Sequence, residues 1–177
     1  MVTLYTSFFR LDVPEYWSCW IEVDSKDELT ANSIFFSNNE GLQASLEVLA
    51  GSDAESLPFQ CEQSVVAEID SLAGYIDDYD ENFPNEIVGI YNDEANSHAH
   101  RHFFRFIGNL AVHGVLVSSY IEDDFEIMRK LLESFDVFKM PNFGLGVTRM
   151  KFSLLDVSKF DSVGNNRYVL AKDEFPN

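Results

Sequence analysis

Three of the four histidines in this sequence lie at every second position of the segment NSHAHRH. Alternate residues of a β-strand project to one face, so His98, His100 and His102 would form a row if this segment is a strand. Neutral imidazole nitrogens are common zinc ligands, and the ring of His113 and the carboxylate of Glu94 are further candidates. The spacing therefore raises the hypothesis of a metal-binding protein or a metal-dependent enzyme.

The same spacing also argues against one shared ion. Each step of two residues along a strand advances about 6.6 Å, which carries an evenly spaced row beyond the reach of a single metal. The row also lacks the tight ligand pairs that make zinc motifs specific. We therefore favour a solvated strand end, with His113 as a hydrogen-bonded residue in the core or at its boundary, and we expect no cofactor.

No motif of nucleophilic catalysis or phosphate binding occurs in the sequence. A GxSxG elbow, a P-loop and a GxGxxG turn are all missing. Cys19 lies in the segment WSCW, and a small thiol beside aromatic residues is more typical of a core than of a reactive site. These observations lean against an enzyme and leave the question open.

Acidic residues dominate the charge. The 30 Asp and Glu residues outnumber the 12 Lys and Arg residues, which gives a net charge of -18. Such a field repels nucleic acid and anionic lipid, so we expect neither nucleic-acid nor membrane binding. It can instead steer a basic protein partner toward the surface. The candidate contacts come from two dense acidic segments and are Asp77, Asp78, Asp80, Glu81, Glu122, Asp123 and Asp124.

The cysteines and the hydropathy pattern indicate a compartment. Cys19 and Cys61 lie in unrelated contexts, without the CxxC pairs or the dense framework of small secreted domains. No segment resembles a secretory signal or reaches the apolar length needed to cross a bilayer. We expect a soluble, cytoplasmic protein, and the sequence leaves its oligomeric state open.

Apolar spacing predicts the elements. Alternation indicates strands over residues 7–13, 18–24, 33–37 and 42–50, the last with Gln43, Ser45 and Glu47 facing water. A period of three to four indicates helices over residues 62–79 and 122–135. Further strands are expected over residues 86–91, 100–107 and 110–121, with a tight turn at Gly108-Asn109 that places Phe104 opposite His113. The segments RMKFSLL and RYVLA suggest a hairpin near the C-terminus.

This order of elements predicts an α+β fold, a mostly antiparallel sheet with two main helices packed against it, in one domain over residues 1–177. The opening segment FRLDVPEYW and the segment LLESFDVF resemble the first strand and the final helix of PsbP-like domains. That resemblance implies an α/β/α sandwich with a core over residues 1–138. The tail beyond Met140 departs from the family pattern, and we expect residues 139–177 to form a C-terminal β extension that either extends the sheet or covers its edge. PsbP-like domains occur in many bacterial proteins and mostly bind protein partners, without a shared catalytic constellation.

Three functional hypotheses result. The first is a non-enzymatic protein–protein interaction module of immunity or adaptor type, with an acidic surface that attracts a basic partner. The second is the metal-binding protein or enzyme built on the histidine row. The third is a small-ligand carrier with a pocket between sheet and helix.

Overall fold

The structure is a computed structural model. It describes residues 2–24, 29–72, 74–78, 85–92, 97–117, 122–141 and 146–171, with the backbone alone at 77, 78, 91, 92, 97 and 98. The elements, in chain order, are β1 (Val2–Tyr5), β2 (Phe9–Val13), β3 (Ser18–Glu22), β4 (Thr30–Ala31), β5 (Ser33–Ser37), β6 (Gln43–Ala50), α1 (Leu57–Ser71), β7 (Tyr75–Asp78), β8 (Glu86–Asn92), β9 (Ser97–Ile107), β10 (Leu110–Val117), α2 (Glu122–Ser134), β11 (Asp136–Val137), β12 (Thr148–Arg149), β13 (Phe152–Ser153), η1 (Val157–Lys159), β14 (Phe160–Ser162) and β15 (Arg167–Leu170).

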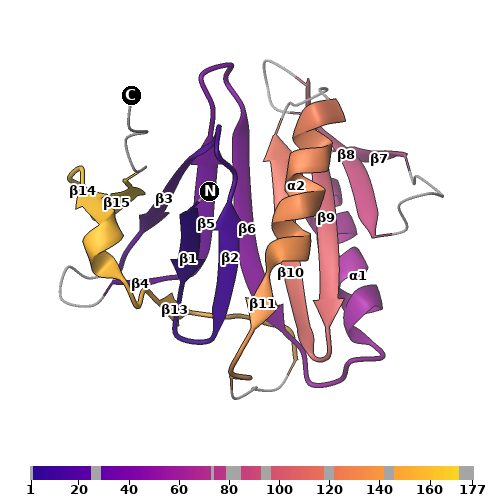
Figure 1. Ribbon diagram of the computed structural model, residues 1–177. Helices are drawn as coiled ribbons and strands as arrows, with labels where there is room; N and C mark the ends of the chain where they lie inside the picture. Colours follow the sequence, from indigo (N-terminus) through magenta and orange to yellow (C-terminus); the bar gives the residue numbers. More distant parts are fainter. Residues whose placement is uncertain are drawn as a thin grey trace.

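A large antiparallel sheet forms the centre of the molecule, which confirms the predicted α+β class. Its strands follow the order β14-β15-β3-β5-β6-β10-β9-β8-β7, and β12 pairs with the end of β6 beyond β5. A small sheet, β1-β2-β11, lies with α2 over one face of the large sheet, and α1 lies behind the other face (Figure 1). We call these two sides the α2 face and the α1 face.

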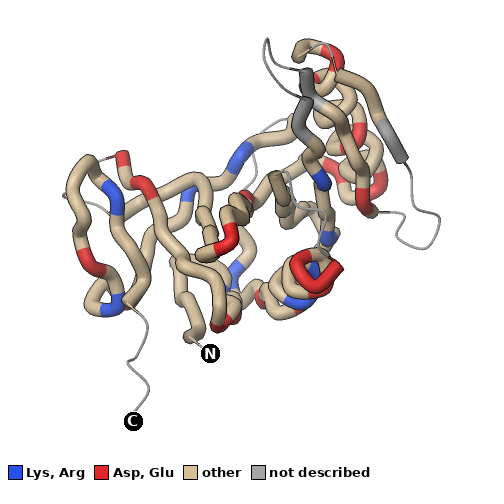
Figure 2. The backbone as a smooth tube through the Cα atoms, turned by 90° about the horizontal axis from the view of Figure 1, so that it is seen from above, with Lys and Arg blue, Asp and Glu red and all other residues tan. Residues whose placement is uncertain are grey.

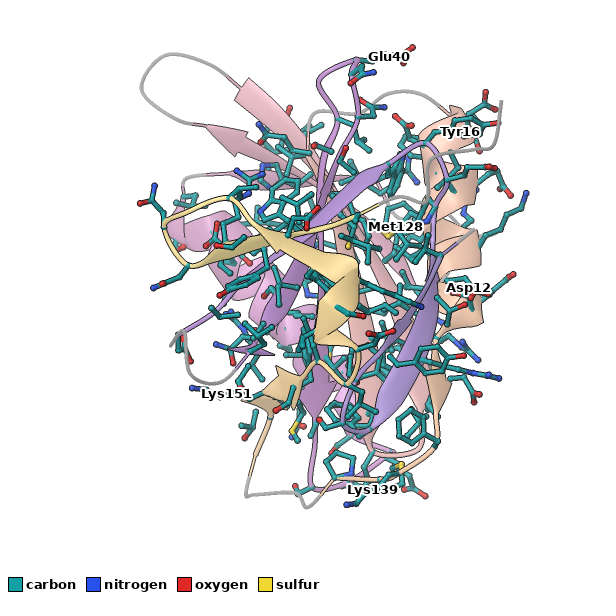
Figure 3. The ribbon with its side chains drawn as sticks, turned by 60° about the vertical axis from the view of Figure 1, so that its left-hand side comes forward. Asp12, Tyr16, Glu40, Met128, Lys139 and Lys151 are labelled. Carbon is teal, nitrogen blue, oxygen red and sulfur yellow. The ribbon has the colours of Figure 1, made fainter. Side chains whose placement is uncertain are left out.

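The main core lies on the α2 face. Alternating residues of β2 and β6 are buried there, as their sequence pattern predicts, together with the apolar side of α2. Helix α2 packs tightly on the sheet at Gly114, where an added Cβ would lie 2.6 Å from Met128 Sδ. Figure 3 labels Met128 on this helix. A smaller core lies under α1 and includes Cys61, Ile87 and Phe104.

The turn at Gly108-Asn109 is confirmed. Gly108 has a φ of +56°, and the strands leave the turn with Ile107 opposite Leu110. Three cross-strand steps further, Phe104 lies opposite His113, as predicted. This register fixes the positions of the histidines.

The helix predicted over residues 62–79 is wrong at both ends. Helix α1 begins earlier, because the carboxylate of Asp53 accepts hydrogen bonds from the backbone N–H groups of Glu55 and Ser56 just before it. It ends at Ser71, and the chain then crosses β8 so closely that a Cβ on Gly74 would lie 2.2 Å from the carbonyl oxygen of Ile90. The segment that follows pairs with β8 as strand β7, so its apolar spacing belongs to an edge strand.

The predicted hairpin of the C-terminal region is also wrong in its pairing. The segment RYVLA pairs as β15 with β14 and with β3, whereas RMKFSLL divides between β12, which pairs with β6, and β13, which pairs with β4. Strands β12, β14 and β15 therefore extend the large sheet, whereas β13 and β4 form a separate two-stranded sheet. Among the described helices, none has the length and apolar character needed to cross a membrane.

Candidate functional site

Four polar side chains form a connected chain on the α1 face. His102 on β9 lies with Nδ1 2.9 Å from Nε2 of His113 on β10, and Nδ1 of His113 lies 3.0 Å from Oε1 of Glu47 on β6. The other oxygen of Glu47 lies 2.7 Å from Nε of Arg149 on β12. The chain thus runs from a buried imidazole to an exposed guanidinium across four strands.

Strand register produces this alignment. Glu47 and His113 are directly paired across β6 and β10, and His102 lies diagonally from His113 across β10 and β9. The ring of Phe104, directly opposite His113, stacks on it with 4.4 Å between centroids and 5° between planes. The aromatic contact holds the His113 ring in the orientation that its two hydrogen bonds require.

The hydrogen-bond partners and the burial of these side chains determine which of their atoms carry protons. A carboxylate only accepts, so Nδ1 of His113 donates to Glu47. His102 is 1% exposed, and its pKa falls to about 3 because burial penalises the charged ring, with His113 and His100 adding repulsion. Burial would raise the pKa of Glu47, but the hydrogen bond and attraction of His113, together with Arg149, lower it overall. Near neutral pH the chain therefore holds a neutral His102 and an ionised Glu47.

The histidine row is only partly brought together. His102 and His113 meet through a hydrogen bond, and the ring of His100 lies 6.4 Å from that of His102 between centroids. The side chain of His98 and all of Glu94 lie outside the described residues. No group of three His, Cys, Asp or Glu side chains in the described residues has an arrangement suited to a metal. The solvated strand end is wrong for His102, and the metal hypothesis stays a prediction.

Both cysteines are buried, in line with the core position expected for Cys19. Cys61 lies on the inner side of α1, and burial, followed by the negative charge of Glu47, raises its pKa to about 11. A thiol with such a pKa stays protonated near neutral pH and is a poor nucleophile. Cys61 therefore gives the polar chain no nucleophilic partner.

The acidic candidates on α2 differ from one another. Glu122 and Asp123 are exposed in the first turn, where the helix dipole favours negative charge, but Asp124 is 6% exposed and cannot be a surface contact. Nη1 of Arg129 lies 3.4 Å from Glu122 and 2.6 Å from Glu126. The acidic surface of α2 is thus partly neutralised.

Two of the four acidic candidates after α1 belong to the edge of the large sheet. Asp77 and Asp78 belong to the edge strand β7, and Asp80 and Glu81 lie outside the described residues. Just before them, Glu68 and Asp70 are exposed in the last turn of α1 and make no ion pair with a described Lys or Arg.

Exposed apolar residues accompany these carboxylates. Leu72 follows α1 directly and is 47% exposed, and Tyr75, the first residue of β7, is 55% exposed. We call the group of Glu68, Asp70, Leu72, Tyr75, Asp77 and Asp78 the acidic corner. In Figure 2 the tube of α1 carries red segments and no blue, in agreement with its sequence.

Sequence reasoning missed part of this arrangement, although one signal was readable. Residues 27–100 hold 16 Asp and Glu residues and no Lys or Arg, which marks α1 and β7 as the least neutralised part of the chain. The predicted solvent position of Glu47 is wrong in part, because its carboxylate is partly covered and bound to His113. That pairing depends on β6 meeting β10, a contact between distant segments without a local sequence signal.

Comparison with known proteins gives little further guidance. No protein-family model and no curated protein matches the sequence. A solved structure from Bacteroides thetaiotaomicron is similar over 74% of this chain at 10% identity, with a TM-score of 0.41. The alignment spans 45% of that structure's own chain, so this chain corresponds to less than half of its length.

Proposed function

We propose that the protein is a non-enzymatic interaction module, of immunity or adaptor type, that binds a basic protein partner through the acidic corner. The observation that carries this proposal is the pair Glu68 and Asp70, exposed at the end of α1 without a basic neighbour among the described residues. Two carboxylates and two exposed apolar side chains offer both charge attraction and contact area to a basic, partly apolar surface.

Helix electrostatics support this position. The C-terminal end of a helix carries partial negative charge, so Glu68 and Asp70 lie where carboxylates are least favourable. Helix α1 has no basic residue in its last turn to offset them. A cationic partner would relieve this repulsion, so the unbound protein carries a local cost that binding removes.

The resemblance to PsbP-like domains supports the same class of function. Its two stretches pack together: Phe9 stacks on Phe135 with 4.4 Å between ring centroids, and Val137 pairs with Phe9 across β11 and β2. A bacterial PsbP-like sandwich is accordingly the fold we propose within the α+β class. Cys19 and Cys61 are both buried and form no disulfide bond with each other, which fits a cytoplasmic location.

A matched pair of double variants tests the proposal. Glu68→Gln with Asp70→Asn removes two charges from the end of α1, and Glu122→Gln with Asp123→Asn removes the same two from the start of α2. Each protein is immobilised, exposed to host extract at low salt, and eluted with increasing salt while mass spectrometry quantifies the captured proteins. We expect a basic protein that the unaltered chain and the α2 variant retain, that the α1 variant loses, and that salt releases.

Equal capture by the two variants would place the contact elsewhere on the molecule. Capture of nothing at low salt by the unaltered chain would reject the interaction module itself. Both variants must first show cooperative thermal unfolding, so that lost capture reports on the surface rather than on the fold.

A further inference from the structure

A second site lies on the α1 face at the opposite end of the large sheet, where β15, β3 and β5 are neighbours. Trp20 on β3 is paired with Phe35 on β5, and their rings stack with 5.7 Å between centroids and 20° between planes. The guanidinium of Arg167 on β15 lies 4.1 Å from the centroid of the Trp20 ring. A cation and two aromatic rings therefore form one continuous stack across three strands.

A depression of ≈ 480 Å³ opens beside this stack. This volume falls within the range of about 300–1,000 Å³ that is usual for small-molecule sites. Besides the stack it is lined by the β5–β6 hairpin, whose tip carries Glu40, labelled in Figure 3. The polar lining residues are Ser37, Asn38, Gln43 and Arg167, and the apolar ones include Trp20, Phe35, Leu42 and Ala44.

Arg167 has no ionic partner among the described residues, although the protein is strongly acidic. Glu22 lies directly across from it on β3, yet no described carboxylate lies within ion-pair distance of its guanidinium. Its Nε is buried and has no hydrogen-bond partner within the part of the chain that the structure describes. Stacking on Trp20 holds the planar guanidinium in place while its N–H groups remain available, which suits bidentate binding of a carboxylate.

The hairpin adds hydrogen-bond donors to the same depression. Oδ1 of Asn38 accepts from the backbone N–H groups of Glu40 and Leu42, at 3.0 Å and 2.9 Å. The amide nitrogen of Asn38 is left as a donor, and the hydroxyl of Ser37 and the amide of Gln43 lie on the same lining. Donors outnumber acceptors beside an apolar wall, and this combination selects an anion with an apolar body.

We propose that this depression binds a small aromatic or similarly planar carboxylate, with the carboxylate held by Arg167 and the ring against Trp20 and Phe35. The site is separate from the acidic corner and does not depend on it. Charge complementarity selects the acid over its neutral amide, because removing the charge leaves only the apolar contacts and weaker hydrogen bonds.

Fluorine NMR with a defined probe pair tests the proposal. 4-Fluorobenzoate and the neutral 4-fluorobenzamide are titrated with the full chain, and the dissociation constant comes from the concentration dependence of the fluorine signal. We expect the acid to bind at least about tenfold more tightly than the amide, since a hydrogen bond to a charged group typically contributes this much or more. We also expect Arg167→Gln to weaken binding of the acid by a similar factor and to leave binding of the amide unchanged.

Arg10→Gln is the matched control, because Arg10 is an exposed arginine on the small sheet, paired with Asp136. Equal binding of acid and amide, no saturable binding of the acid, or equal loss in Arg167→Gln and Arg10→Gln would each overturn the proposal. The comparison of acid and amide uses the unaltered protein, so it decides the question even if Arg167→Gln does not fold.

Discussion

The buried imidazole of His102 makes the stability of this protein depend on pH. An unfolded histidine takes up its proton near an ordinary pKa of about 6.5, whereas the pKa of folded His102 is about 3. Between these values the unfolded chain binds more protons than the folded one, so stability falls as the pH is lowered through this window. Well above the unfolded pKa, His102 is neutral in both states and does not make the stability depend on pH.

We predict that the unaltered protein loses about 2 kcal/mol of unfolding free energy from this group between pH 7 and pH 5. His102→Gln should lose correspondingly less over the same interval, because glutamine does not titrate. Urea unfolding of both proteins at the two pH values measures the difference. Equal losses would show that His102 is protonated in the folded state.

Glu86 provides a second prediction at this scale. Its carboxylate is buried between two arginines, with oxygens 2.6 Å from Nε of Arg129 and 3.0 Å from Nη1 of Arg101. The hydrogen bond that Arg129 donates to Glu86 is the largest cause that raises the pKa of Arg129, so that guanidinium stays charged. We predict that Glu86→Gln destabilises the fold by about 3 kcal/mol, because it leaves partly buried positive charges uncompensated.

The exposed pair of Arg10 and Asp136 is the control for this measurement. Nη2 of Arg10 lies 3.0 Å from Oδ2 of Asp136, and both side chains are half exposed. Asp136→Asn should therefore destabilise the fold far less than Glu86→Gln in the same denaturation experiment. Similar costs for the two variants would mean that the burial of Glu86 contributes nothing.

At the scale of elements, each of the two helices has a pair of exposed acidic residues, and the two pairs lie at opposite helix ends. Glu68 and Asp70 lie at the end of α1, and Glu122 and Asp123 at the start of α2. We predict that Glu68→Gln with Asp70→Asn raises the unfolding free energy, and that Glu122→Gln with Asp123→Asn lowers it, by about 0.3–1 kcal/mol per charge. Thermal and denaturant unfolding at low salt measures both changes. Changes of the same sign would remove the electrostatic basis of the acidic corner.

Local sequence signals correctly predicted the elements whose residues follow a regular pattern or a known turn preference. Strand β6 alternates, Gly108 can adopt a positive φ, and α2 combines a regular apolar stripe with acidic residues in its first turn. The boundary between α1 and β7 was mispredicted because Leu72 and Ile76 continue a helical spacing by coincidence. The close approach of Gly74 to β8 ends that helix, and such a contact between distant segments leaves no periodic signal.

At the scale of the molecule, acidic and basic residues are unevenly distributed along the chain. Of the 30 acidic residues 26 precede residue 139, whereas six of the 12 basic residues follow residue 138. The later segment supplies Arg149 to the polar chain and Arg167 to the aromatic stack. Neither of these two arginine contacts could be predicted from the sequence, because β12 and β15 are short strands whose partner strands lie far away in the sequence.

We predict that a chain ending at residue 141 does not fold stably. It would lose the buried residues Phe152, Leu154, Phe160 and Leu170 and would leave β3 as an unpaired edge. Loss of cooperative unfolding and of near-ultraviolet circular dichroism would confirm this. Supplying residues 142–177 as a separate chain should restore both signals, and a truncated chain that unfolds cooperatively on its own would contradict the prediction.

The pairing of β3 with β15 also has a consequence during synthesis. Trp20 and its cross-strand neighbour Val169 are separated by most of the polypeptide. At translation rates of about 5–20 residues per second, the ribosome adds Val169 roughly 7–30 seconds after Trp20. During that interval the partner strand of this β3 edge has not been synthesised, so the backbone groups that β15 later pairs with are open to pairing with another chain.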